Sequence, residues 1–111
     1  MTRDEILNMK AGREMDALIA ERVMKLQVSG LLIYQGDSRE MASGTLPRYS
    51  IDIGAAWSVV ESFDGEAARI SKAYGMDGNY YFVRIGKTEE TGDHSVCVAI
   101  CRAALLAKVA E

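Results

Sequence analysis

The chain has 111 residues, a formal net charge of −3 and a pI of about 5.2, which excludes the broad basic surface typical of proteins that bind duplex DNA or RNA. Apolar residues make up 49% and charged residues 26%, as in an ordinary globular protein, so we expect one domain over residues 1–111. No apolar run is long enough to span a membrane, and the charged N-terminus has no signal-peptide core. The two cysteines are expected to be free thiols in a reducing cytoplasm.

The first predicted elements are helices. Thr2 and Glu5 fit a capping box, in which each side chain satisfies a free amide at a helix start. Gly12 interrupts the apolar pattern, which resumes at helical spacing from Met15 to Leu26. The pattern predicts a short first helix, a break at this glycine and a longer amphipathic helix.

A β-rich segment follows. Residues 28–36 are short, apolar and end in glycine, which predicts a strand. Residues 37–48 are polar and small and hold the only proline. They are compatible with a flexible loop or with a hairpin whose second strand is short.

The middle of the chain predicts another helix, over residues 49–63. Ser50 is a good N-cap residue, and an aspartate in the first turn suits the positive end of the helix dipole. Ile53, Trp57 and Val60 fall on one apolar stripe. We therefore expect Trp57 in the core.

A β-hairpin is predicted next, with strands over residues 68–74 and 80–85 around an Asp-Gly turn. In the second strand the side chains alternate, so that Tyr80, Phe82 and Arg84 share one face. Polar residues 86–93 predict a solvated loop, and a closing helix is expected from about His94 to Ala110. This order of elements predicts an α+β fold, with helices packed on a small, mostly antiparallel sheet.

The closing segment holds the only histidine and both cysteines of the chain, at positions His94, Cys97 and Cys101. On a helix they share one face, but a structural zinc site needs four ligands and the chain has no further Cys or His. The cysteines are therefore expected to pack in the core, with no metal bound. Arg102 stands within the same apolar run. It either reaches the helix edge or binds an anion at a pocket rim.

Three segments taken together resemble the phage ABA sandwich domain, a family of small bacteriophage-encoded proteins. The segments are EILNMKAGREMDALIAERVM, YSIDIGAAWSVVE and AICRAALLA, and they cover about half of the chain. The region after Met24 departs from the family pattern. The resemblance implies an α-β-α sandwich and a phage accessory role. Small phage proteins of this kind include some that sequester the nucleotide signals of bacterial defence systems such as Thoeris and CBASS.

The resemblance and the residues together suggest a nucleotide sponge. This is an anti-defence protein that sequesters a cyclic ADP-ribose-like or cyclic oligonucleotide signal without cleaving it, in the cytoplasm of the infected bacterial host. Such a ligand needs aromatic faces for its base and charged donors for its phosphates. The expected ligand-binding residues are Arg84, Tyr80, Phe82, Arg69, Arg48 and Arg102.

Several alternatives stay open at this point. A cross-strand salt bridge would account for Arg84, and packing between helix and sheet would account for Tyr80. The protein would then act through a protein–protein interaction, with no small-molecule ligand. Scattered carboxylates argue against an enzyme, so we expect no catalytic residues and no cofactor. A small domain with so little polar surface is also expected to form a homo-oligomer.

Overall fold

The computed structural model describes residues 1–34 and 44–109. Most of the segment for which the sequence allowed either a loop or a hairpin therefore lies outside the described residues. The helices are α1 (Arg3–Leu7), α2 (Arg13–Leu18), the π-helix η1 (Ile19–Val23), α3 (Ile53–Ser62) and α4 (Val96–Val109). The strands are β1 (Gln27–Ser29), β2 (Leu32–Tyr34), β3 (Gly44–Thr45), β4 (Ala68–Gly75), β5 (Gly78–Ile85) and β6 (Thr91–Asp93).

The two predicted N-terminal helices are confirmed, and so is the break between them. The side chains of Thr2 and Glu5 form the expected capping box at the start of α1. Gly12 has a φ of +147°, in the region that L side chains rarely adopt, and it separates α1 from α2. The second helix ends in the π-helical turn of η1 at Val23, three residues earlier than the apolar pattern suggested.

The first β segment is a hairpin and not the single predicted strand. Gly30, with φ of +60°, turns the chain between β1 and β2, which pair antiparallel with each other, and β2 pairs in turn with β3. The Ser-Gly dipeptide at this position is a sequence pattern that marks a turn.

The N-cap of α3 is Asp52 and not the predicted Ser50. The Asp52 carboxylate accepts the backbone N–H of Gly54 at 2.9 Å. Ser50 is instead buried: its N–H donates to the Asp16 carboxylate at 2.8 Å, and its hydroxyl accepts the N–H of Gly12 at 3.0 Å. A tertiary junction between α2 and the start of α3 therefore uses the serine that local preference assigned to a cap.

The prediction that Trp57 lies in the core is wrong. Trp57 is 49% exposed and Ile53 is 55% exposed, whereas Ala56 and Val59 on the neighbouring side of α3 are fully buried. The helix thus turns its small and medium side chains toward α4, which allows the two helices to approach closely. The largest apolar side chain of α3 stays at the surface.

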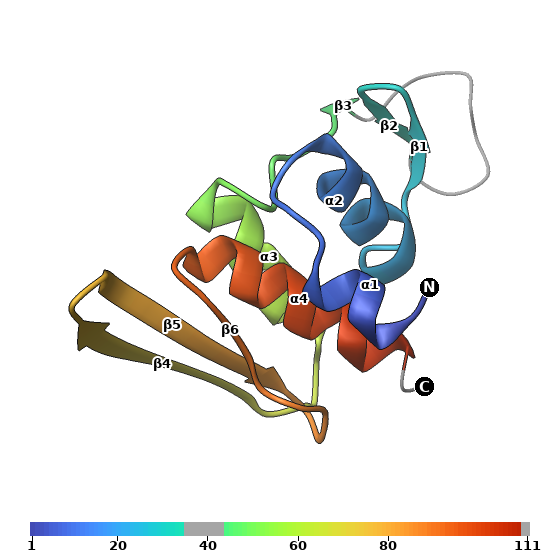
Figure 1. Ribbon diagram of the computed structural model, residues 1–111. Coiled ribbons are helices and arrows are strands. Elements are labelled where there is room, and N and C mark those ends of the chain that lie inside the picture. The colour runs from blue at the N-terminus through green and yellow to red at the C-terminus, as the bar shows by residue number, and fades with distance from the viewer. Residues whose placement is uncertain (35–43, 110–111) are drawn as a thin grey trace.

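The predicted hairpin is confirmed, and the order of the sheet is β4-β5-β6, antiparallel throughout. Strand β6 was not predicted, since its sequence reads as a polar loop. Thr91 explains it: this residue is buried, and its hydroxyl donates to the carbonyl of Ala99 in α4 at 2.8 Å. The described helices lie on one side of this sheet (Figure 1), which confirms the α+β prediction of helices packed on a small antiparallel sheet.

Helix α4 is the centre of the fold. Ten of its 14 residues are buried, and it contacts β5, β6, α3, η1 and α1. Cys97 and Cys101 lie on its buried surface, as predicted for core residues, and burial raises the pKa of both thiols. Within residues 1–34 and 44–109, no helix has the length and apolar character needed to cross a membrane.

Candidate functional site

The β4-β5-β6 sheet has two different faces. Its inner face packs on α4: Val83 and Ile85 of β5 are fully buried there, with Thr91 of β6 beside them. Because side chains alternate along a strand, this burial turns Phe82 and Arg84 to the opposite face. We call that opposite face the outer face. It carries Arg69, Ser71, Ala73, Tyr80, Phe82, Arg84 and Gly92.

Two arginines stand directly opposite each other on the outer face. Arg69 of β4 is the register partner of Arg84 of β5, and both are exposed. In the described part of the chain neither side chain forms an ion pair, so the cross-strand salt bridge considered for Arg84 is not found there. Like charges at directly opposed positions destabilise a sheet. An anion held between the two guanidinium groups would relieve that repulsion.

An aromatic cluster continues the same face toward the hairpin tip. The rings of Tyr80 and Phe82 lie 5.1 Å apart between centroids and are tilted by 55°. His94 meets Tyr80 edge-on at 4.9 Å, and its Nδ1 lies 3.0 Å from the carbonyl oxygen of Asn79. Tyr80 therefore packs on the outer face, not between helix and sheet as the alternative had it. Tyr80 and Phe82 are half-buried and His94 is exposed, so the cluster offers ring faces and edges to a ligand.

Gly92 permits this arrangement. A Cβ atom at this position would lie 2.6 Å from Cε1 of Tyr80, closer than real Cβ contacts allow. The tyrosine ring thus rests on the bare backbone of β6. The sequence contained no indication of this contact, because it depends on the pairing of an unpredicted strand.

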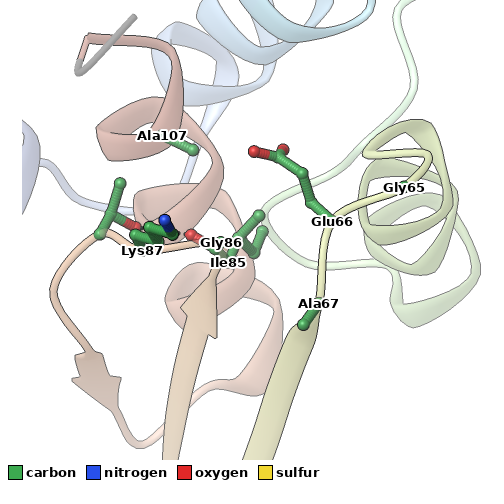
Figure 2. A pocket seen from close by; sticks show the side chains of 8 residues that line it. Gly65, Glu66, Ala67, Ile85, Gly86, Lys87 and Ala107 are labelled. Atoms are coloured by element: carbon green, nitrogen blue, oxygen red, sulfur yellow. Dashed lines mark hydrogen bonds between the residues drawn. The ribbon is translucent and has the colours of Figure 1, made fainter.

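Two hollows adjoin at the base of the hairpin. Arg69 and Arg84, with Ala67 and Gly86, line a hollow of about 200 Å³. A larger one of about 520 Å³ shares Ala67 and Gly86 and extends to the last turns of α4. Figure 2 shows the Glu66 carboxylate directed across this larger hollow, toward the side on which Ala107 lies. Its volume falls in the range of small-molecule sites.

The two hollows differ in electrostatic character. The larger one is lined by one carboxylate, that of Glu66, and one ammonium group, that of Lys87, near the C-terminal end of α4. The smaller one holds two guanidinium groups. A phosphate is therefore favoured at the arginines, and a neutral or hydrogen-bond-donating group is favoured beside Glu66.

The other two predicted arginines do not join the outer face. Arg102 donates to the Asp93 carboxylate at 3.1 Å and to the carbonyl of Met9 at 2.7 Å, which ties α4 to β6 and to the α1–α2 connection. Arg48 is exposed in the segment between β3 and α3, outside this sheet. Of the six residues predicted to bind a ligand, the structure gathers Arg69, Tyr80, Phe82 and Arg84.

Sequence reasoning missed two contributors to this region. His94 was expected only as the start of the closing helix, and its contact with Tyr80 follows from the β5–β6 pairing. Glu66 was not considered because its segment reads only as a turn. Among the described residues, no group of three or more His, Cys, Asp or Glu side chains is placed to hold a metal ion.

The fold and this face together define a small α+β domain whose sheet packs on α4 along β5 and leaves its outer face open. The sequence matches the family model of the phage ABA sandwich domain over residues 17–105, so the chain belongs to that family. The structure is similar to that of a phage protein from Bacillus cereus ATCC 14579, with a TM-score of 0.69 and 24% identity, over 89% of this chain and 93% of that one. This likeness confirms the fold. No curated protein matches the sequence.

Replacing Gly92 with Ala should destabilise the protein, because the new methyl group collides with the Tyr80 ring that Phe82 and His94 hold in place. We expect a loss of about 1–2 kcal/mol in the free energy of unfolding, measured by urea denaturation. Gly75→Ala is the matched control, since a Cβ there meets nothing within 4 Å. Equal effects of the two substitutions would contradict the packing described for Tyr80.

Two arginine substitutions should separate a structural role from a surface one. Arg102→Ala leaves the Asp93 carboxylate without its charged partner, so the free energy of unfolding should fall by about 2–3 kcal/mol. Arg84→Ala removes one of two opposed like charges and should change the free energy of unfolding by no more than about 0.5 kcal/mol. Thermal and urea melts of both variants measure the difference. A large loss with Arg84→Ala would show that this residue supports the fold.

Proposed function

We propose that this protein binds a nucleotide signal of the bacterial host on the outer face of the β4-β5-β6 sheet and withholds it without cleaving it. The candidate ligands are cyclic ADP-ribose-like molecules and cyclic oligonucleotides. The observation that carries the proposal is the opposed pair Arg69–Arg84, exposed and without a carboxylate partner among the described residues.

The neighbouring groups suit the remainder of such a ligand. Phe82 lies two residues from Arg84 on the same face, so a base resting on its ring leaves the phosphates about 7 Å away, within reach of a guanidinium group. Ser71, the register partner of Phe82, adds a hydroxyl beside this ring on the neighbouring strand. The outer face thus offers the aromatic and cationic groups that nucleotide recognition requires, side by side.

Glu66 adds a means of selection at the same end of the sheet. Its carboxylate accepts hydrogen bonds only, so it favours the amino or ring N–H edge of a base or a ribose hydroxyl over a phosphate. A ligand that spans both hollows would place its phosphates on the arginines and a donor group beside Glu66. Inorganic phosphate alone would use half of these contacts.

Membership in a phage family supports the anti-defence part of the proposal. A phage gains from removing a host alarm signal, and binding removes it from solution as long as the protein is in excess over the ligand. The outer face offers aromatic rings, guanidinium groups and a hydroxyl, which are groups that recognise a ligand. A protein–protein role is the alternative, and the ligand experiment decides between the two.

Thermal melting in the presence of cyclic ADP-ribose isomers, cyclic dinucleotides and cyclic trinucleotides tests the proposal. A ligand bound only to the folded state stabilises it by about 2.7 kcal/mol when its concentration is 100 times its Kd, so the Tm should rise clearly with one class. Arg84→Ala and Arg69→Ala should each abolish most of that shift. Arg22→Ala, an exposed arginine on η1, should leave it unchanged.

The bound ligand should be recovered intact after heat denaturation, as analysed by liquid chromatography. Recovery of cleaved products would show an enzyme and contradict the sponge. No shift with any of these nucleotides would contradict ligand binding and favour a protein partner. A shift that survives both arginine substitutions would place the site elsewhere on the molecule.

A further inference from the structure

Two exposed apolar surfaces lie outside the proposed ligand site. The first is a stripe on α3, formed by Ile53, Trp57 and Glu61 at successive i, i+4 positions. The second is the part of the sheet's inner face that belongs to β4, formed by Ile70, Lys72 and Tyr74. Each surface combines two large apolar side chains with one charge. Exposed apolar clusters of this kind mark interaction sites.

The second surface belongs to a hairpin arm, which we define as residues 70–81. Strand β6 pairs with β5 only from Tyr81 to Val83, so most of the arm is a two-stranded ribbon, which is marginally stable on its own. Every residue of β4 is exposed; Tyr74 is 84% exposed, and Met76 at the turn is fully exposed. Figure 1 shows the tip of this hairpin extending past the helices. In the described part of the chain, the arm lacks a surface that covers its apolar side chains.

The α3 stripe matches the arm in length and in charge. From Ile53 to Glu61 the helix rises about 12 Å, and from Ile70 to Tyr74 the strand extends about 13 Å. The stripe carries the acidic Glu61, and the arm carries the basic Lys72. Both surfaces occur on every copy of the chain. A second copy is therefore an occupant that supplies the complementary surface and is always present.

We propose that the hairpin arm of each copy packs against the α3 stripe of a second copy, reciprocally, in a two-fold symmetric dimer. In such an isologous arrangement the arm-on-α3 contact occurs twice, and the assembly closes without leaving a free surface for further growth. Trp57 and Tyr74 are the central apolar residues of each contact. The outer face with Arg69 and Arg84 points away from this contact, so dimer formation and ligand binding are tested separately.

The dimer is tested by multi-angle light scattering after size exclusion, with the full chain at micromolar concentration. The wild-type protein should have the mass of two chains. Trp57→Arg and Tyr74→Glu each place an unpaired charge at the apolar centre of the contact, where Trp57 of one copy meets Tyr74 of the other. Each variant alone should therefore have the mass of one chain, with a far-UV circular dichroism spectrum like that of the wild type.

Mixing the two variants is the decisive measurement. In the mixed pair, one contact joins an unaltered arm to an unaltered α3. The other contact brings the carboxylate introduced by Tyr74→Glu against the guanidinium introduced by Trp57→Arg. The mixture should therefore recover the mass of two chains. Leu31→Arg, which alters an exposed apolar residue of the β1–β2 turn, is the matched control and should stay dimeric.

Three results would overturn the proposal. A wild-type protein with the mass of one chain up to high micromolar concentration would exclude the dimer. A dimer that survives Trp57→Arg but not Tyr74→Glu would show arm-to-arm pairing. Two monomeric variants that do not recover on mixing would show that the arm and α3 do not contact each other. Should either variant misfold, Glu61→Lys and Lys72→Glu form an equivalent pair for the same mixing experiment, since each alone sets like charges against each other and the mixture restores an opposite-charge pair.

Discussion

The burial of α4 is the constraint on which the rest of the structure depends. This helix is apolar on nearly all sides, with small residues such as Ala99 and Ala103 that let neighbouring elements approach closely. It can only be stable if it is covered all round, and β5, β6, α3, η1 and α1 provide that cover. Arg102 is the charged exception within the buried run. Placing this charge among apolar residues is costly unless it is paired. Its bonds to Asp93 and to the Met9 carbonyl pair it and link α4 to β6 and to the α1–α2 connection.

The open face of the sheet is a direct result of this burial. Val83 and Ile85 must face α4, and strand alternation then places Phe82 and Arg84 outside. The register of the hairpin adds Arg69 beside Arg84, which concentrates positive charge on a protein whose net charge is negative. The candidate site is thus an exposed surface supported by a buried core, with hollows at its edge.

The sequence predicted those elements whose pattern and partner are both local. The hairpin follows from alternation and a turn, and the core cysteines follow from a helix that is apolar all round. Ser50, Trp57 and β6 were misread because tertiary partners decide them: a buried carboxylate for Ser50, the small residues of the α3–α4 contact for Trp57, and a carbonyl of α4 for Thr91. In the candidate site, alternation alone grouped Tyr80, Phe82 and Arg84. Placing Arg69 opposite Arg84 required the register, and excluding Arg102 required its partners.

The central claim is that Arg69 and Arg84 together hold the phosphates of a nucleotide. Nuclear magnetic resonance of ¹⁵N-labelled protein tests it most directly, by following the arginine Nε–H signals during titration with cyclic ADP-ribose and then with cyclic di-AMP. We predict that one of these ligands shifts the signals of both Arg69 and Arg84, while the signal of Arg102, which is paired with Asp93, stays in place. Shifts that leave both outer-face arginines unchanged would contradict it, and so would the absence of any shift with these two ligands and with cyclic trinucleotides.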